Sequence, residues 1–173
     1  MQDLTPFGRY VTVEDRPALR FERRLAHPVD AVWRSVTEPN ELAHWFPARV
    51  ELDLRVGGRM RFTFPGDAFP PTEGEVTECD PPHRFAFDWG EEHLRFEIEP
   101  DGDGSILRFT HVLEARDAAA RDAAGWHVCI DKLEERLAGG APEAPGTEQT
   151  PEHRELYAEY ERRGLPTGAA MPS

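Results

Sequence analysis

The stretch DAAGWHVCIDKLEERLAGG, residues 122–140, decides the fold of this chain. Its apolar residues recur at every third or fourth position, which is the spacing of one face of an α-helix; they are Trp126, Cys129, Ile130, Leu133 and Leu137. Gly139 and Gly140 follow, at the place where a helix end favours glycine. We predict a helix over residues 117–138, about 30 Å long, whose wide apolar face has to be covered by another element.

The residues before this helix predict the covering element, which is a sheet. Apolar and polar residues alternate along short segments, as they do in strands with one buried and one exposed face. These segments are ARVELDL (48–54), MRFTF (60–64), EGEVTEC (73–79), RFAFDWG (84–90), HLRFEIEP (93–100) and SILRFTHVLE (105–114), after an earlier one at 19–25. Short turns rich in glycine, proline and aspartate separate them, so we expect neighbouring strands to be antiparallel.

Two short helices are predicted between the first strand and the remaining ones. Val29, Val32 and Val36 have helical spacing after a proline, and Pro39 breaks this helix. NELAHWF (40–46) is typical of a second, short helix. The order of the elements predicts an α+β helix-grip fold, in which a curved antiparallel β-sheet wraps around a long C-terminal α-helix.

The chain is expected to form one domain with short additions at both ends. We assign residues 1–17 to an N-terminal extension, 18–140 to the helix-grip domain and 141–173 to a tail. The tail begins with the linker GAPEAPGTEQTPE and continues as a short helix over 151–164, for which weak docking and free movement both stay open. Residues 165–173 are expected to be disordered. Deleting 141–173 should then leave the melting temperature nearly unchanged.

Charge and composition restrict the partners and the location. The 33 acidic and 20 basic residues give a formal net charge of −13, which disfavours nucleic acid and anionic membranes as partners. The N-terminus has no basic region followed by an apolar run, and no segment approaches the roughly 20 apolar residues of a membrane span. We therefore expect a cytoplasmic protein, in which Cys79 and Cys129 stay reduced.

No motif in the sequence points to a metal, a cofactor or covalent catalysis. The histidines lack the H-E-x-x-H spacing of zinc sites, and the two cysteines are far apart. There is no G-x-S-x-G motif, no P-loop and no dinucleotide-binding fingerprint. We therefore assign no catalytic residue, no metal ligand and no cofactor.

Four motifs in the expected order resemble a known superfamily. They are HPVDAVWRSVTEPNELAHWFP, DLRVGGRMRF, GEVTECDPPHRFAFDW and GWHVCIDKLEERLAG. Together they resemble the SRPBCC (START/Bet v-like) superfamily over about residues 18–139, and within it the bacterial homologues of the activator of the heat-shock-protein-ninety ATPase. The resemblance implies a seven-stranded antiparallel sheet around the long helix, an apolar cavity between them, and ligands such as lipids or polyketides. Some relatives are aromatase/cyclases, and nothing in the chain matches the domain with which the eukaryotic activator docks on the chaperone.

A mostly aromatic set of residues is the candidate ligand site. It comprises Trp45, Phe46, Phe62, Phe64, Phe85, Phe87, Trp89, Phe96, His111, Trp126 and Ile130. Each ring has two interpretations, since an apolar stripe at strand or helix spacing is ordinary core in most proteins. In the other interpretation, large rings on a concave sheet wall an apolar pocket with a few polar groups.

Several polar residues accompany this set. His111 alternates with the apolar residues of its strand, so it either satisfies a backbone carbonyl or water, or orients a ligand. Arg23 is expected at the strand edge or paired with an acid, or else it neutralises a ligand carboxylate. Glu78 is expected to point inward, with Arg23 or Arg61 as a partner. His44 and His127 are predicted to lie on the surface.

Three classes of function remain open on the sequence. The first is a binding protein for a hydrophobic small molecule held between sheet and helix. The second is a cyclase-, aromatase- or hydrolase-like enzyme with the same pocket, which needs two or more converging titratable groups. The third is a chaperone- or stress-associated interaction protein, marked by an exposed apolar patch. The edges of such a sheet would also allow a homodimer.

Overall fold

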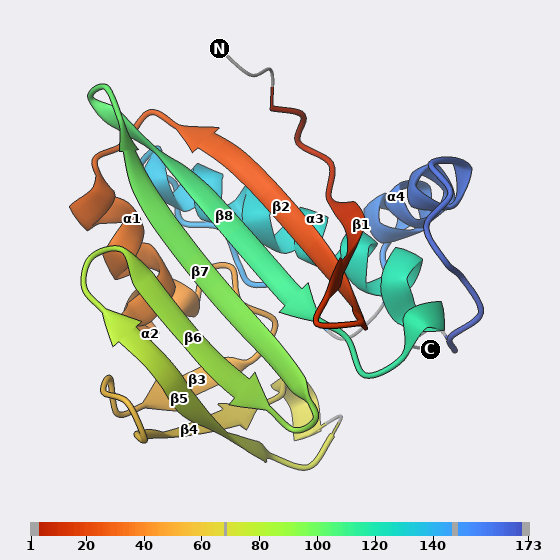
Figure 1. Cartoon of the computed structure of the whole chain (residues 1–173), viewed down its shortest axis with the longest axis horizontal. Helices are drawn as coiled ribbons and strands as arrows, with labels where there is room; N and C mark the ends of the chain where they lie inside the picture. The colour runs from red at the N-terminus through yellow and green to blue at the C-terminus, as the bar shows by residue number, and fades with distance from the viewer. Residues whose placement is uncertain (1–3, 68, 147–148, 171–173) are drawn as a thin grey trace.

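The computed structural model describes residues 4–67, 69–146 and 149–170, and it contains a single antiparallel sheet (Figure 1). The order of its strands is β1-β2-β8-β7-β6-β5-β4-β3. The strands are β1 (Arg9–Val13), β2 (Arg16–Leu25), β3 (Arg49–Leu52), β4 (Arg59–Thr63), β5 (Thr72–Asp80), β6 (Arg84–Trp89), β7 (Glu92–Asp101) and β8 (Gly104–Val112). The helices are α1 (Val29–Thr37), α2 (Pro39–Leu42), α3 (Ala119–Leu137) and α4 (Pro151–Arg162), with 3-10 turns at Pro65–Asp67 and Arg116–Ala118.

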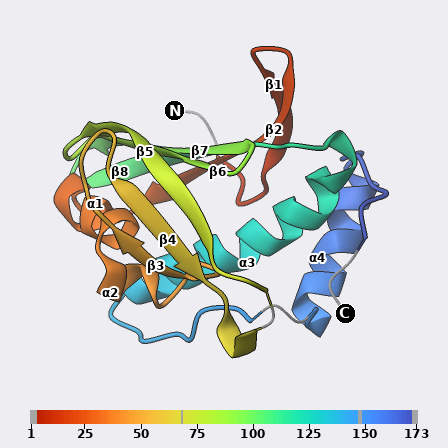
Figure 2. The same cartoon turned by 90° about the horizontal axis from the view of Figure 1, so that it is seen from below.

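The sheet curves over α3, which confirms the predicted helix-grip fold. Figure 2 shows α3 crossing beneath the sheet, with α1 and α2 at one end and α4 at the other. Ala123, Ile130 and Leu133 of α3 are at most 1% exposed. On the strands, Phe85, Phe96 and Phe109 are among the side chains that bury the concave face. Period-two alternation on the strands and helical spacing on α3 therefore meet in one core.

The sheet has eight strands, so the seven-stranded sheet implied by the resemblance is corrected. Residues 9–13, assigned from the sequence to an extension, pair with β2 as the edge strand β1. Glu14 and Asp15 form the two-residue turn between them, both at positive φ (49° and 64°). Hairpin turns with two positive-φ residues usually carry asparagine or glycine, so the sequence gives little sign of this one.

A β-bulge corrects the predicted orientation of Glu78. The pairing between β5 and β6 shifts between Val76 and Glu78, which inserts one extra residue into β5. An insertion of one residue moves the following side chains to the opposite face of the sheet. Glu78 therefore lies beside Arg95 (3.4 Å) and Arg84 (3.9 Å), and not beside Arg23 or Arg61 as expected.

The tail is docked, which resolves the alternative left open by the sequence. Helix α4 packs against α3, and Tyr160 is fully buried. The Tyr160 hydroxyl accepts a hydrogen bond from the Gly8 backbone N–H (2.9 Å) and lies 2.8 Å from His127 Nδ1. His127 is only 6% exposed, so its predicted surface position is wrong. A helical wheel of α3 alone cannot show that a second helix covers this side.

The segment after α4 is also ordered where the structure describes it. Leu165 is buried, and the Pro166 carbonyl accepts a hydrogen bond from the Ala120 N–H in the first turn of α3 (2.9 Å). The Ala169 N–H donates to the Asp117 carbonyl (3.2 Å). The disorder expected for 165–173 therefore does not hold for 165–170, and 171–173 lie outside the described residues. Backbone groups at the helix N-terminus have no partner within the helix, which gives this segment its anchor.

Candidate functional site

The aromatic residues of the concave face pack against one another. Phe62 and Trp89 stack with ring centroids 4.2 Å apart, and Phe109 meets Trp126 edge-on at 4.8 Å. Phe46 lies 5.7 Å from both Trp89 and Trp126. These separations are those of directly contacting rings. The rings between the sheet and α3 therefore contact one another as core residues do.

Most of the predicted site residues belong to this ring cluster or to the surrounding core. Trp45, Phe46, Phe62, Phe85, Phe87, Phe96 and Ile130 are at most 2% exposed, and Trp126 is 6% exposed. Phe64 and Trp89 are half-buried. Trp45 donates its indole N–H to the Ser35 carbonyl (2.8 Å), and Trp89 donates to the Thr72 hydroxyl (2.8 Å). Phe64 and Trp89 are thus the two rings of the set that keep substantial access to solvent.

An open groove of about 750 Å³ lies beside the ring cluster. Its lining residues come from α2 and the segment after it, from β3, from the end of β4 and from the linker: Pro39, Asn40, Ala43, Phe46, Pro47, Ala48, Arg49, Val50, Glu51, Leu52, Thr63, Phe64, Pro65, Ala144 and Pro145. Of the predicted residues, Phe46 and Phe64 line it. A smaller hollow of about 190 Å³ involves Arg84, Ile106 and Arg108 on other strands.

The linker forms one wall of the groove. Figure 2 shows the chain running back from the end of α3 past α2 and β3 to α4. His44 Nδ1 lies 2.8 Å from the Pro142 carbonyl oxygen, so this nitrogen carries the proton and donates. His44 is half-buried by this contact, where the sequence analysis placed it on the surface. The docked tail therefore holds Ala144 and Pro145 over the groove.

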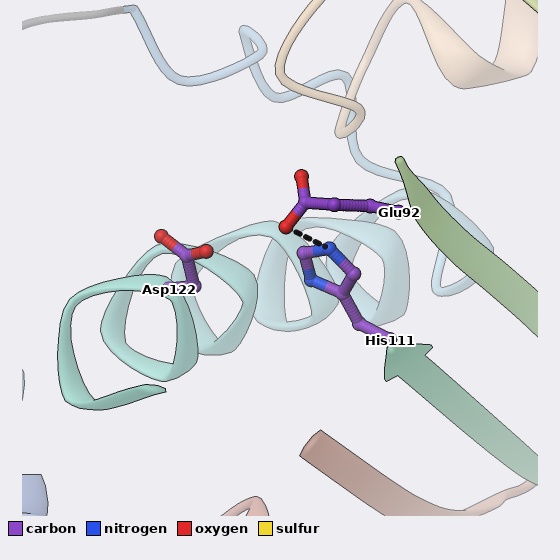
Figure 3. A group of neighbouring side chains, drawn as sticks. All are labelled: Glu92, His111 and Asp122. Carbon is purple, nitrogen blue, oxygen red and sulfur yellow. Dashed lines mark ion pairs between the residues drawn. The ribbon is translucent and has the colours of Figure 1, made fainter. Parts of the chain in front are cut away.

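A polar cluster lies on the concave side at the ends of β7 and β8. His111 on β8 is 4% exposed, and its Nδ1 accepts a hydrogen bond from the Trp126 indole N–H (2.8 Å). Its Nε2 lies 3.1 Å from Glu92 Oε1 on β7 (Figure 3). Nε2 is fully buried, yet no acceptor among the described residues lies in line with its N–H bond. Asp122 on α3 lies next to this pair (Figure 3).

The indole fixes the proton on the His111 ring. An indole N–H only donates, so Nδ1 must present its lone pair to Trp126. In the neutral ring the proton then sits on Nε2, which faces Glu92. His111 is therefore held as a hydrogen-bond donor toward the carboxylates.

The same geometry tests whether the cluster suits a metal ion. One ligand atom each from Glu92, His111 and Asp122 lies within 4.8 Å of the others. A histidine ligand, however, offers a bare ring nitrogen and usually donates from its other nitrogen. Binding a metal at Nε2 would require a proton on Nδ1, where the Trp126 N–H already points. The donor set is therefore close enough for a cation, but the proton arrangement opposes one.

The two carboxylates of the cluster differ in their surroundings. Burial disfavours ionisation of Glu92, but the His111 ring, the Glu114 backbone and the Arg121 charge outweigh it and lower its pKa. Asp122 is held by Arg121, whose Nε donates to it at 2.8 Å. Glu92 is thus the carboxylate that contacts His111, whereas Asp122 is paired with Arg121.

Sequence reasoning missed Glu92 and Asp122 as well as most of the groove. Glu92 pairs directly across the β6–β7 hairpin with Trp89, so hairpin register could have placed it on the concave face. Asp122 falls four residues before Trp126, which is one helical turn. The groove had no such signal, because its walls come from segments far apart in the chain.

Two further expectations concern polar groups of the core. Arg23 is 5% exposed and pairs with Asp131 (3.0 Å) and Glu134 (2.5 Å), which confirms the expected pairing with an acid. Cys79 and Cys129 are both free thiols in the structure. Burial raises the pKa of Cys129 far above its usual value, which keeps this thiol protonated at neutral pH.

Comparisons with known proteins agree with the fold. The model of the family described as "Activator of Hsp90 ATPase homolog 1-like protein" matches residues 26–138. No protein of curated function matches the sequence. Within the described residues, no helix is long and apolar enough to cross a membrane.

Solved structures resemble this chain over more of its length than the family model matches. The solution structure of CalU16 from Micromonospora echinospora is 25% identical with a TM-score of 0.70, covering 89% of this chain and 88% of that one. EF2215 from Enterococcus faecalis, a protein of unknown function, is 20% identical with a TM-score of 0.70, covering 90% and 89%. DynU16, from the dynemicin biosynthetic locus, is 26% identical with a TM-score of 0.64, covering 72% of this chain and 48% of its own.

Proposed function

This chain belongs to the family of Activator of Hsp90 ATPase homolog 1-like proteins, and from that premise we propose that it binds a hydrophobic small molecule, lipid- or polyketide-like, in the groove between α2, β3, β4 and the linker. The single observation that carries the proposal is the groove itself. It is concave, its volume is about 750 Å³, and its lining includes the rings of Phe46 and Phe64. Ligand sites are typically concave and mostly apolar, and of this size.

Partly exposed aromatic rings near the groove favour the binding of an apolar ligand. Phe64 is half-buried and stacks toward Trp89, with ring centroids 6.0 Å apart. Phe69, in the loop after β4, is 52% exposed and meets Phe64 edge-on at 5.6 Å. Exposed rings cost free energy in water, and a ligand that covers them would recover it. The biosynthetic locus of DynU16 is compatible with a natural-product ligand for this chain as well.

Binding is favoured over catalysis by the state of the polar cluster. An enzyme in this pocket needs converging groups that can take up and release protons. Glu92 and His111 do converge, but the Trp126 N–H occupies the lone pair of Nδ1, and Nε2 already carries the proton. His111 is therefore equipped to donate a hydrogen bond rather than to act as a base. We accordingly rank carriage or sensing above a cyclase- or hydrolase-like activity.

Titration with Nile red, a neutral apolar fluorophore, tests the proposal. We expect saturable binding to the full chain, and an affinity about tenfold lower in Phe64→Ala, because covering a phenylalanine side chain contributes roughly 1.5–3 kcal/mol. Phe64 is half-buried, so this variant should still fold. Circular dichroism melting of each variant confirms that the comparison concerns folded protein.

The matched control is Ile106→Ala, which removes a half-buried apolar side chain from the smaller hollow. It should leave the affinity for Nile red unchanged. Loss of affinity in Ile106→Ala with none in Phe64→Ala would place the dye elsewhere and contradict the proposal. Absence of saturable binding by the wild-type chain would contradict it outright.

A further inference from the structure

We propose that the Glu92–His111 pair is a subsite for a hydroxyl group, alcoholic or phenolic, carried by the apolar ligand. This inference rests on the proposed function and specifies the chemistry of its ligand. One ligand oxygen would accept the hydrogen bond from His111 Nε2 and donate its own proton to the Glu92 carboxylate. No bond to carbon forms or breaks, so the subsite selects a ligand without transforming it.

The donor half of the subsite is His111. The residue is 4% exposed, and its Nε2 is fully buried without an aligned acceptor among the described residues. A buried donor whose nearest acceptor, here Glu92 Oε1 at 3.1 Å, is poorly aligned loses part of the roughly 0.5–1.5 kcal/mol of a hydrogen bond, which is a reason to expect a better-placed partner from outside the chain. The Trp126 hydrogen bond holds the proton on Nε2 and fixes the ring in the direction of Glu92.

The acceptor half of the subsite is Glu92. Its Oε1 lies 3.1 Å from His111 Nε2, so one small group can contact both atoms. The Glu92 side chain is 30% exposed, which leaves a path from solvent. A donor and an acceptor side by side complement a hydroxyl group, which has both functions in one atom.

Trp89 lies between the subsite and two of the residues that line the groove. Trp89 pairs with Glu92 across the β6–β7 hairpin, so both side chains lie on the concave face. Its ring also stacks with those of Phe46 and Phe64, which line the groove. On the other side, Trp126 contacts both Phe46 and His111. A ligand whose apolar body lies along these rings would present its polar end to the Glu92–His111 pair.

A hydroxyl group fits the pair better than a cation does. Two carboxylates would attract an ammonium group or a metal ion, but Asp122 is already paired with Arg121 at 2.8 Å. An ammonium group has no lone pair to accept the Nε2 proton, and a metal ion needs that proton removed. A hydroxyl group leaves every proton where Trp126 holds it.

Equilibrium dialysis against three naphthalenes tests the inference. They are 2-naphthol, 2-methoxynaphthalene, which lacks the donor proton, and 2-(aminomethyl)naphthalene, which is a cation. We expect the full chain to bind 2-naphthol about tenfold more tightly than the methoxy compound, as one added hydrogen bond to a charged group allows. Glu92→Gln should reduce this preference to about twofold or less.

Asp122→Asn is the matched control, because it removes a charge from the same cluster but not the proposed acceptor. It should keep the preference for 2-naphthol. Equal binding of 2-naphthol and its methyl ether by the wild-type chain would overturn the inference while leaving the proposed function intact. The inference would also be overturned if the ammonium compound bound most tightly, or if Asp122→Asn alone removed the preference. If none of the three bound and Nile red did not bind either, both proposals would fall.

The proton position is open to a direct test. Long-range ¹H–¹⁵N correlation spectra should show His111 with a bare Nδ1 and a protonated Nε2 at neutral pH. In Trp126→Phe the ring loses this constraint, and Co²⁺ should then bind more readily than to the wild-type chain. Strong Co²⁺ absorption bands in the wild-type chain that vanish in His111→Gln would show a metal site and overturn the hydroxyl assignment.

Discussion

The two sides of α3 carry polar groups of different kinds. Toward the sheet, Trp126 reaches His111, whose second ring nitrogen has no aligned acceptor within the described residues. Toward α4 and the N-terminal segment, His127 has the Tyr160 hydroxyl at one nitrogen and Asp131 at the other, at 2.8 Å and 3.6 Å. Both histidines are almost equally buried, at 4% and 6% exposed.

The two histidines differ in the groups of the chain that contact their ring nitrogens. At His127 both ring nitrogens face groups of the chain, Tyr160 of α4 at 2.8 Å and Asp131 of α3 at 3.6 Å, and Gly8 of the N-terminal segment donates to the Tyr160 hydroxyl. At His111 the Glu92 carboxylate lies 3.1 Å from Nε2 but off the line of its N–H bond, and Glu92 is reachable from solvent. Buried polar groups are normally paired, so a closed network indicates a structural role and an open one indicates a ligand. We call the side of α3 that carries His127 and faces α4 the closed side, or tail side, and the side that carries Trp126 and faces His111 the sheet side. The comparison predicts that substitutions on the tail side lower stability, and that substitutions on the sheet side lower ligand affinity.

The largest effect of a single substitution is expected at Tyr160. The residue is fully buried, and its hydroxyl connects Gly8 with His127. Tyr160→Ala should lower the free energy of unfolding by about 3–5 kcal/mol, as for other buried aromatic residues, which is roughly 10 °C in melting temperature for a chain of this length. Thermal melts followed by circular dichroism measure the shift. Tyr157→Ala, on the same helix but only partly buried, should shift it far less.

Deletion of residues 141–173 should be at least as destabilising as Tyr160→Ala. This reverses the expectation from the sequence alone, because α4 covers His127 and the segment after it caps the start of α3. A deletion variant that melts at the wild-type temperature would show that the tail side is not part of the stable unit. The prediction that substitutions on the tail side lower stability would then be wrong.

The tail shows what the sequence could and could not predict. Strands β2 to β8 and the long helix followed from local periodicity, and the helix at 151–162 from its flanking proline and glycine, which are signals that depend only on neighbours in the chain. The docking of α4 did not follow, because Tyr160 meets residues 152 positions earlier at Gly8. The bulge before Glu78 and the glycine-free turn at Glu14 and Asp15 are likewise set by pairing with a neighbouring strand.

The burial of most of the predicted rings followed from the sequence, but their arrangement did not. Alternation correctly placed His111 among apolar residues of the concave face. It could not show that the rings around it contact one another and that the groove lies beside them. That outcome depends on the way β3 and β4 fold under α2, and on a linker whose path is fixed by His44 and Pro142. Volume and packing are properties of the assembled core, so periodicity carries no information about them.

An intermediate effect is expected at Arg23, which belongs to the closed side. Its guanidinium donates to Asp131, Glu134 and the Pro6 carbonyl. The Asp131 and Glu134 side chains are 45% and 39% exposed, so water can replace the lost partner for them. Arg23→Met should therefore cost about 1–2 kcal/mol, less than breaking a fully buried pair. Urea unfolding measures this, and Nile red affinity should stay unchanged; a large loss of affinity would assign Arg23 to the ligand instead.

The smallest effect is the pH dependence of the closed side. Burial lowers the pKa of His127, with Arg23 and Arg163 acting in the same direction and Asp131 opposing them. As the pH falls, His127 takes up a proton at a higher pH in the unfolded chain than in the folded chain. The contribution of neutral His127 to the free energy of unfolding is therefore fully present above about pH 6.5. It should fall as the pH decreases below that value, because protonation then places a charge at a buried position. Melting temperatures between pH 7.5 and 5 should therefore drop by a few degrees more in the wild type than in His127→Gln, whose side chain does not titrate.

A second histidine contributes to the same pH dependence. Because burial also lowers the pKa of His153 on α4, His153→Gln should remove a separate part of the dependence of the melting temperature on pH. If both variants kept the wild-type slope, the histidines of the docked tail would not be the groups that titrate.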